Sequence, residues 1–446
     1  MTSREETAQA KGEGEEEGTI GLTATCLCKA QHFRTHVPRT SLPLSAIYCH
    51  CTSCRRATGA LYSTYVPWPG PGSSIHASSL RRYTFSASAS VTTLACSVCG
   101  TTVFAETAAE DGSPRYGVQT GCLANIAGIE VGGTAADGNG DGGVAGGSLI
   151  NITHHVFVGD TQDGGATPWL CDTNSDGSRP RLWRGHRGGE ELPYHWPLPF
   201  AQAESSKTGD DKAKETEEDE DEEIPIRCHC GGVNLVLRHP TAAFANTARS
   251  ELPWFIDPTS HKSLGTFDAC DSCRLSSGVD IFHWTFALLR HLSFPPPKFT
   301  SAVNSSSTTT PTPSFPTSSI ELKKAIATPP PNRDPRWGTL TFYSSSPDVQ
   351  RYFCSRCSAA VFYASDDRPE LVDVALGVLD SKRGSRAEDV VSWDFGGKVG
   401  WRQDVVGGWR EGFVDRVEAA ADRWRIERGY PKNWRRIQKE EAAAEG

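Results

Sequence analysis

Residues 91–104 read VTTLACSVCGTTVF, and residues 349–362 read VQRYFCSRCSAAVF. The first valine, both cysteines and the closing Val-Phe pair keep the same spacing in the two stretches. A second pair of stretches agrees in the same way, with SCRRATG at 53–59 and SCRLSSG at 272–278. Agreement at so many fixed offsets indicates an internal repeat, which governs the interpretation of the whole fold. We therefore predict two tandem copies of one domain.

Cysteines occupy most of the repeated positions. The chain has 15 cysteines, and all but two fall into tight pairs or triplets. These groups are Cys26 and Cys28; Cys49, Cys51 and Cys54; Cys96 and Cys99; Cys228 and Cys230; Cys270 and Cys273; and Cys354 and Cys357. Disulfide frameworks rarely cluster so locally, and the cysteine count is odd. The pattern therefore favours zinc binding over disulfide bonds.

Composition narrows the class of protein. The chain has 446 residues, enough for two or three domains, and a net charge of −9, which disfavours nucleic acid and anionic membranes as partners. It opens with a polar, acidic stretch and contains no apolar run of about 18 residues. We expect a cytoplasmic protein, with the nucleus as the alternative, that has no secretory signal and no membrane partner.

Shifts in composition divide the chain into segments. The stretch ETEEDEDEE at 215–223 indicates a solvated acidic linker between the two copies. The second copy is longer because of a Pro/Ser/Thr-rich segment at about 294–336, which we predict to be a disordered insertion. The expected organisation is a disordered N-terminus at 1–19, a first zinc domain at 20–200, a disordered acidic linker at 201–223, and a second zinc domain at 224–430.

Short runs of β-branched and aromatic residues surround the cysteines. Such runs, separated by turn residues, predict a mostly β fold. The expected strands are 61–66, 81–85, 91–96, 101–106 and 152–158 in the first copy, and 233–237, 283–289, 339–343, 360–364 and 371–379 in the second. Helical spacing appears near the end of the chain, at about 411–428, and predicts a short C-terminal helix.

The outer cysteine pairs of each copy can supply four thiolates to one metal ion. Zinc favours tetrahedral sulfur coordination, and such closed sites hold small domains together. The two predicted structural sites are Cys26, Cys28, Cys96 and Cys99 in the first copy, and Cys228, Cys230, Cys354 and Cys357 in the second. His229 is a less favoured ligand because four sulfurs already complete the second site.

The central triplet of Cys49, Cys51 and Cys54 has one ligand fewer. Three thiolates on zinc leave a fourth position open, which is typical of a catalytic site. A further thiol bound there would be held as a thiolate, the reactive nucleophile. The alternative is a closed site with His50 as the fourth ligand, although a histidine between two cysteines would tend to point away.

The motifs of the first copy resemble the glutathione-dependent formaldehyde-activating enzyme family, which also includes centromere protein V relatives. The resemblance rests on the Cys26 pair, the Cys49-His50-Cys51 triplet motif that continues through Arg55, Arg56 and Gly59, and the Cys96 pair followed by Gly100. It implies a β-tent, Mss4-like fold, a structural zinc on the outer cysteines and a catalytic zinc on the triplet. It also implies a carbon–sulfur lyase activity, the reversible addition of the glutathione sulfur to formaldehyde.

The second copy departs from this pattern at its triplet. Alignment on Cys270 and Cys273 places Asp268 where the first cysteine of the triplet stands. Aspartate can bind zinc through oxygen, so the second copy either holds a metal on Asp268, Cys270 and Cys273 or holds none there. We expect two zinc ions in the first copy and one or two in the second, and we favour the first copy as the active half. The first copy departs elsewhere, with Lys29 where the family usually has glycine.

Two arginines follow the triplet directly. Arg55 and Arg56 could bind a carboxylate of a glutathione-like substrate, or they could have a structural role, since Arg274 recurs at the position of Arg55. The leading hypothesis is a zinc-dependent lyase that acts on small thiols or thiol adducts of aldehydes, with glutathione as the expected thiol. The alternative is a non-catalytic tandem zinc module for protein or chromatin contacts.

Overall fold

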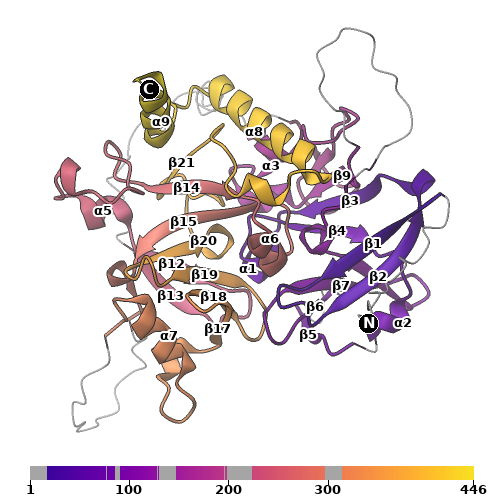
Figure 1. The fold of residues 1–446 in the computed structure, drawn as a ribbon, viewed down its shortest axis with the longest axis horizontal. Helices are drawn as coiled ribbons and strands as arrows, with labels where there is room; N and C mark the ends of the chain where they lie inside the picture. The colour runs from indigo at the N-terminus through magenta and orange to yellow at the C-terminus, as the bar shows by residue number, and fades with distance from the viewer. Residues whose placement is uncertain are drawn as a thin grey trace, which may run out of the picture.

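The computed structural model describes residues 18–76, 78–85, 91–127, 129, 147–194, 196–197, 223–296 and 314–445. The predicted disordered N-terminus up to residue 17, the acidic linker up to residue 222 and residues 297–313 of the predicted insertion lie outside these ranges. We call residues 18–197 the first half and residues 223–445 the second half. Figure 1 shows the two halves as β-rich bodies side by side, the first in indigo to magenta and the second in rose through orange to yellow.

The first half contains a hairpin and one large sheet. Its hairpin pairs β1 (Thr19–Thr25) with β2 (His32–Pro38). The large sheet has the order β11-β10-β9-β3-β4-β8-β7-β6-β5 over the described residues. Its strands are β3 (Leu44–Cys49), β4 (Ser63–Pro67), β5 (Arg81–Thr84), β6 (Thr92–Ala95), β7 (Thr102–Ala108), β8 (Pro114–Val118), β9 (Ile150–Val156), β10 (Arg181–Trp183) and β11 (Glu191–Leu192).

The second half has a small and a large sheet of the same kind. The small sheet has the order β12-β13-β16 and the large one β17-β18-β19-β20-β15-β14-β21 over the described residues. The strands are β12 (Glu223–Arg227), β13 (Asn234–Arg238), β14 (Ser263–Asp268), β15 (Phe282–Leu288), β16 (Leu292–Ser293), β17 (Leu340–Ser346), β18 (Val349–Cys354), β19 (Ala360–Ser365), β20 (Leu371–Ala375) and β21 (Val391–Trp393).

The two large sheets share one strand order. The series β5-β6-β7-β8-β4-β3-β9 of the first half matches β17-β18-β19-β20-β15-β14-β21 of the second. The unusual end of the series also agrees, because β3 pairs with β9 in parallel and β14 pairs with β21 in parallel. The repeated sequence motifs therefore lie on corresponding strands of the two sheets.

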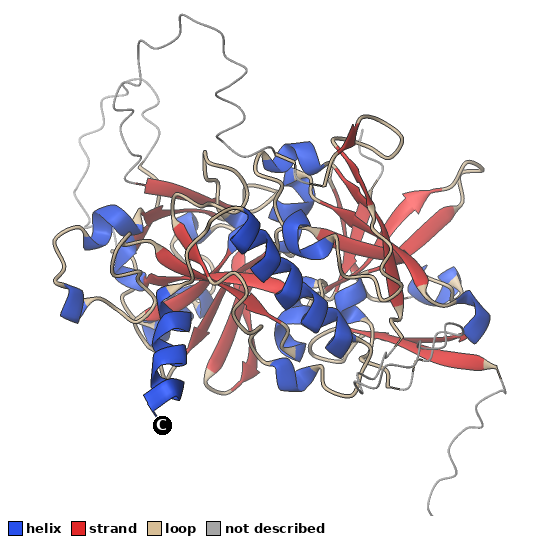
Figure 2. Cartoon of the chain, turned by 90° about the horizontal axis from the view of Figure 1, so that it is seen from above, coloured by secondary structure: helices blue, strands red, loops and turns tan. Residues whose placement is uncertain are grey.

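The burial of the strands follows from their sequences. In β1, Ile20, Leu22 and Ala24 are buried while the residues between them are more exposed, as expected for a strand with one face on the core. All positions of β15 are buried, which suits its apolar sequence FHWTFAL and its place inside the sheet. The prediction of a mostly β fold is confirmed (Figure 2). The β-tent class and the domain boundaries at 20–200 and 224–430 stay predictions.

Short helices connect the strands. The α-helices are α1 (Thr52–Thr58), α2 (Gly72–His76), α3 (Thr167–Leu170), α5 (Pro240–Phe244), α6 (Asp271–Ser277), α7 (Ser319–Ala327), α8 (Arg410–Glu427) and α9 (Trp434–Glu445). The 3-10 helices are Arg39–Ser41, Thr120–Cys122, Val158–Thr161, Arg249–Glu251, Leu289–His291, Pro335–Trp337, Leu376–Val378 and Arg402–Asp404. Among the described residues, no helix combines the length and the apolar character needed to cross a lipid bilayer.

The structure corrects one expectation about the irregular segments and adds a helix to the predicted C-terminal one. The predicted disordered insertion at 294–336 contains α7, whose N-cap Ser318 accepts a hydrogen bond from the backbone of Glu321 and whose Leu322 and Ile326 are buried. These two apolar residues, one helical turn apart, pack into the core, although prolines and serines dominate the segment around the helix. The single predicted C-terminal helix corresponds to α8, and α9 follows it as a second helix.

The halves share one hydrophobic core. A single cluster of buried residues includes Tyr48 and Tyr62 of the first half and Val279 and Ile281 of the second. Tyr48 and Tyr62 stack with ring centroids 5.2 Å apart, and the hydroxyl of Tyr62 donates to the carbonyl of Ile281 at 2.9 Å. The two halves are therefore packed into one unit, because neither half could separate without exposing part of this core.

The contact between the halves is itself repeated. Helices α1 and α6 end at Gly59 and Gly278, both in the left-handed conformation. The Gly377 N–H donates to the Gly59 carbonyl at 2.8 Å, and the Gly121 N–H donates to the Gly278 carbonyl at 2.9 Å. Each half thus docks a 3-10 helix onto the end of the other half's cysteine-bearing helix, and Figure 1 places α1 and α6 where the halves meet.

We expect Gly377→Ala to lower the free energy of unfolding by about 1–3 kcal/mol, because an added Cβ would overlap the carbonyl oxygen of Ala60 and force the backbones apart. The matched control is Gly185→Ala, where no atom lies within 4 Å of the added Cβ and the expected change is within about 0.5 kcal/mol. Urea denaturation of the full chain measures both. Equal effects of the two substitutions would contradict this close approach.

Candidate metal centres

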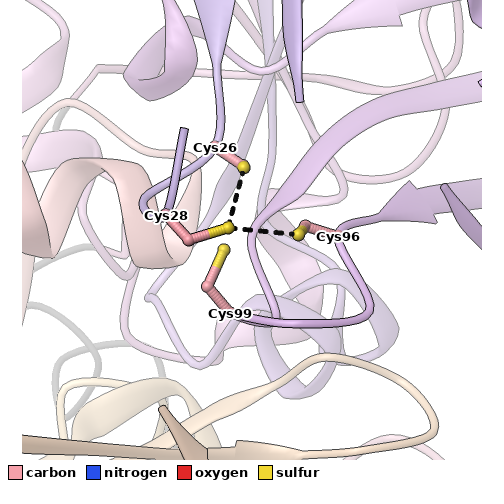
Figure 3. Close-up of side chains that lie close together, drawn as sticks. All are labelled: Cys26, Cys28, Cys96 and Cys99. Carbon is pink, nitrogen blue, oxygen red and sulfur yellow. Dashed lines mark hydrogen bonds between the residues drawn. The ribbon is translucent and has the colours of Figure 1, made fainter. Parts of the chain in front are cut away.

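The outer cysteines of the first half meet at one point. Cys26 directly follows β1, and Cys96 directly follows β6, so two distant turns supply the four sulfurs. Figure 3 shows the side chains of Cys26, Cys28, Cys96 and Cys99 converging from these two turns. The sulfur of Cys28 lies 3.4 Å from that of Cys26 and 3.6 Å from that of Cys96. Tetrahedral zinc with bonds of about 2.3 Å separates its sulfurs by about 3.8 Å, so the group fits a metal ion.

The second half repeats this geometry. Cys228, Cys230, Cys354 and Cys357 place their ligand atoms within 4.8 Å of one another. The sulfur of Cys230 lies 3.6 Å from that of Cys228 and 3.4 Å from that of Cys354. When the four cysteines hold no metal ion, a hydrogen bond from Cys357 lowers the pKa of Cys230 to about 6. These sulfurs therefore already share negative charge, which a metal cation would neutralise.

His229 lies between two of these cysteines but faces another group. Its Nδ1 is 2.7 Å from the hydroxyl of Tyr83 in the first half, and its backbone N–H donates to the carbonyl of Arg56 at 2.9 Å. Its ring therefore belongs to the contact between the halves.

The turn after the first cysteine pair accommodates a departure from the family pattern. Lys29 stands where the family usually has glycine, and its φ is 62°, close to the φ of 70° at Gly231 in the second half. Both turns therefore use the left-handed conformation, which glycine adopts without strain and lysine adopts at a cost of about 1 kcal/mol. The substitution leaves the cluster geometry intact.

The central triplet forms where a strand runs into a helix. Cys49 ends β3, Cys51 is the N-cap of α1, and Cys54 lies in the first turn of α1. The Sγ of Cys51 accepts a hydrogen bond from the backbone N–H of Cys54 at 3.2 Å. Hydrogen bonds from the thiols of Cys49 and then Cys54 lower the pKa of Cys51 to about 3. The strand-to-helix junction therefore gathers three sulfurs and favours the thiolate form of Cys51.

The triplet has no fourth protein ligand within the described part of the chain. The group of possible ligands consists of the three cysteines, and both Cys49 and Cys51 are partly exposed. His50 is fully buried, and its Nε2 lies 2.7 Å from Nδ1 of His155 on β9. Burial lowers the pKa of His50 well below its usual value. The geometry thus favours the open arrangement over a closed site with His50.

The second half carries a mixed cluster at the corresponding place. Asp268 ends β14 as Cys49 ends β3, and Cys270 is the N-cap of α6 as Cys51 is the N-cap of α1. The ligand atoms of Asp268, Cys270 and Cys273 lie within 4.8 Å of one another. One carboxylate oxygen of Asp268 accepts a hydrogen bond from the Cys270 N–H at 2.7 Å. The other oxygen and the two sulfurs remain to bind a cation.

The two arginines after the triplet make structural contacts. The guanidinium of Arg55 is buried and donates to the carbonyl of His50 and the hydroxyl of Thr52, each at 3.2 Å. Arg274 is buried at the corresponding position and donates to the carbonyl of Gly121. Arg56 pairs with Asp380 of the second half at 2.6 Å. These contacts favour the structural alternative for both Arg55 and Arg56.

Two polar residues near the mixed cluster, Arg351 and Tyr363, were not predicted from the sequence as site residues. A cavity of about 650 Å³ borders Asp268, Cys270 and Cys273, and Arg351 and Tyr363 line it as well. Alignment of the two copies does show that polar residues replace smaller ones here, because Arg351 stands opposite Thr93 and Tyr363 stands opposite Ala105. The meaning of this replacement depends on which strands lie side by side, and the alignment alone does not contain that information.

Comparison with known proteins agrees with the geometry of the first half. No curated protein and no solved structure matches the chain. The family model described as glutathione-dependent formaldehyde-activating enzyme matches residues 21–132, a segment that contains the outer four cysteines and the triplet of the first half. Residues 21–132 of the first half are therefore similar to the glutathione-dependent formaldehyde-activating enzyme family.

Proposed function

We propose that the first half is a zinc-dependent carbon–sulfur lyase that acts on thiol adducts of small aldehydes such as formaldehyde. The observation that carries this proposal is the cluster of Cys49, Cys51 and Cys54, three thiols without a fourth protein ligand in the described residues, inside the segment that matches the family. Zinc sites with three protein ligands are typical of catalysis, whereas closed sites with four are structural.

The remaining clusters complete the proposed metal content. The four outer cysteines of each half would hold one structural zinc, and the triplet would hold the catalytic one. The mixed cluster of Asp268, Cys270 and Cys273 would hold a fourth ion. Their geometry supports this assignment, because each group brings its ligand atoms within 4.8 Å of one another.

The proposed reaction joins a thiol sulfur to an aldehyde carbon. A zinc ion on the triplet supplies a coordination position for the substrate thiol and lowers the pKa of that thiol. The carbon–sulfur bond forms as the carbonyl electron pair moves to oxygen, which takes up the proton that the thiol loses. The reverse reaction breaks the same bond and returns the proton, so no oxidant or reductant is needed.

The residues of the chain contribute position and charge. The N–H of Cys54 donates to the Sγ of Cys51, which spreads the negative charge of that sulfur. His50 stays neutral in its buried pair with His155, so it adds no positive charge beside the cluster. Three thiolates and one zinc ion sum to a net charge of −1, which suits a sulfur nucleophile better than the activation of water. A glutathione-type thiol is the proposed substrate.

We expect Cys51→Ser to leave a folded protein that has lost one zinc ion, because the outer cysteines hold the fold. The exchange of glutathione with formaldehyde should fall by about 100-fold or more, as expected for the loss of several kcal/mol of metal assistance. NMR exchange spectroscopy measures the rate, and elemental analysis measures the zinc. The matched control is Cys171→Ser, a buried isolated thiol of the first half, which should retain both the zinc and the rate.

The same measurements separate enzyme from scaffold. A wild-type exchange rate equal to that of the uncatalysed reaction would contradict the lyase proposal. The non-catalytic tandem zinc module would then be the better supported of the two functions. Unfolding of Cys51→Ser would show instead that the triplet has a structural role.

A further inference from the structure

The mixed cluster of the second half opens into a cavity. The cavity has a volume of about 650 Å³, which is within the usual range for small-molecule sites. Asp268, Cys270 and Cys273 lie in its wall. Aromatic side chains line other parts of it, among them Trp254, Trp284, Phe286 and Tyr363. The site therefore combines a possible metal centre with an apolar surface large enough to cover an organic ligand.

Arg351 brings a buried positive charge to this cavity. Its Nη1 lies 3.6 Å from the sulfur of Cys273, and the residue is only 9% exposed. Within the described part of the chain, no carboxylate comes within ion-pair distance of Arg351, so its charge faces the cysteine sulfurs. A divalent metal ion on Asp268, Cys270 and Cys273 would offset two of their three negative charges, and Arg351 would offset the third. Buried charges are normally paired, and in the loaded site this balance would leave no net negative charge to repel an anion from the cavity.

A row of side chains crosses the sheet at this point. The register pairs Arg351 on β18 with Tyr363 on β19, Tyr363 with Asp373 on β20, and Asp373 with Phe286 on β15. The guanidinium carbon of Arg351 lies 5.1 Å from the centroid of the Tyr363 ring. Asp373 pairs with Arg368 at 3.1 Å, so the carboxylate in the row already has its own cation.

The first half lacks this row. Its register pairs Thr93 with Ala105, Ala105 with Gly117, and Gly117 with Pro67. These four positions correspond to the row of the second half because the strand orders agree. In addition, Thr93 lies three residues before Cys96, and Arg351 lies three residues before Cys354. The second half therefore differs from the first in two linked ways: an oxygen ligand replaces a sulfur, and an arginine stands beside the cluster.

The charges explain why the two differences belong together. In both halves three anionic ligands and one divalent ion sum to −1, but Arg351 brings the total in the second half to zero. A neutral site admits an anion at a smaller electrostatic cost than a negative one. The carboxylate of Asp268 also makes the site harder than three thiolates, which favours oxygen donors over sulfur donors.

We propose that the second half binds a small carboxylic acid in this cavity, with the carboxylate between a metal ion on Asp268, Cys270 and Cys273 and the guanidinium of Arg351. Arginine matches the planar geometry of a carboxylate, and the aromatic side chains cover the apolar body of the ligand. The ligand class thus differs from the thiols proposed for the first half. This inference goes beyond the lyase proposal and concerns the other half of the chain.

The test uses the full chain loaded with Co²⁺, whose visible absorption bands report changes of ligands at the metal. A Cys51→Ser background removes the metal from the triplet of the first half, so the mixed cluster is the open site that remains. We expect benzoate to shift the bands at saturation and to bind more tightly than acetate, which lacks the aromatic ring. Benzamide has the same shape as benzoate without the charge, and we expect it to leave the bands unchanged.

The Arg351→Thr variant gives the second half the residue of the first. We expect it to bind benzoate about 10- to 100-fold more weakly, as for the loss of hydrogen bonds to a charged group. If it fails to fold, Arg351→Lys takes its place, and we expect about tenfold weaker binding because lysine lacks the planar pair of donors. Unchanged bands with both acids, equal binding of benzamide and benzoate, or full affinity in the folded variant would overturn the proposal. None of these outcomes bears on glutathione–formaldehyde exchange, so the two proposals fail independently.

Discussion

A Cys99→Ser variant is expected to lose the folded structure of the first half, together with one zinc ion beyond any held by the triplet. Cys99 is buried and is one of four sulfurs that join the turn after β1 to the turn after β6. Structural zinc sites of this kind contribute about 10–16 kcal/mol of apparent binding free energy, which matches or exceeds the total stability of about 5–15 kcal/mol for a typical domain. Far-UV circular dichroism and elemental analysis of the full chain measure the loss.

The matched control is Cys122→Ser. Cys122 is also fully buried in the first half, and its thiol lies 3.4 Å from the carbonyl of Thr102, to which a serine hydroxyl can donate as well. We expect this variant to keep its metal and most of its structure. A chelator should act on the wild type as Cys99→Ser does. A Cys99→Ser protein with wild-type zinc content and melting temperature would contradict a structural metal at this cluster.

An Asp280→Asn variant is expected to lower the free energy of unfolding by about 3–5 kcal/mol, the cost of leaving a buried charge unpaired. Asp280 and Arg410 are both fully buried where the halves meet, with Arg410 Nε 2.8 Å from Asp280 Oδ1. The same carboxylate accepts hydrogen bonds from Tyr48 and Thr120 of the first half. Burial lowers the pKa of Arg410 to about 10, so Arg410 still carries its charge at neutral pH. Chemical denaturation with urea measures the change.

A double-mutant cycle separates the ion pair from general damage to the interface. Leu61 stands at the position of Asp280 in the first half, so Asp280→Leu combined with Arg410→Met replaces the pair by apolar side chains. We expect the double variant to lose less stability than the sum of its single variants. The pair of half-buried Arg402 and exposed Asp415 is the control, since Asp415→Asn should cost at most about 1 kcal/mol. Additive effects at Asp280 and Arg410 would contradict a coupled pair.

The strands could be predicted because their local signals agree with their final environment. The stretch at 371–379 is β-branched and apolar, and β20 forms there at Leu371–Ala375 inside the large sheet. The helix α7 could not be predicted in the same way. Its burial depends on Leu322 and Ile326, two residues in a segment whose composition is typical of disorder. A docking site for such a short apolar stretch exists only once the rest of the half has folded.

The candidate metal centres likewise have parts that the sequence predicts and parts that it does not. Spacing alone predicted which cysteines belong together, because a pair of thiols one or two residues apart can bind one metal from a single turn. The place of Asp268 also followed from alignment of the two copies. The cavity beside it did not, since Arg351, Tyr363 and Asp373 lie 78 or more residues after Cys273 in the chain and come side by side only through the pairing of β18, β19 and β20.

By itself, the sequence determined the repeat, the mostly β character and the grouping of the cysteines, because each of these depends on residues at short, fixed spacings. The tertiary structure decided how the copies combine. Gly59 and Gly278 meet the backbone of the opposite half, and Asp280 pairs with Arg410 inside a shared core. It also decided that the second copy places an arginine beside its mixed cluster. These features depend on strand register and on contacts between residues 78 or more positions apart, which only the folded chain brings together.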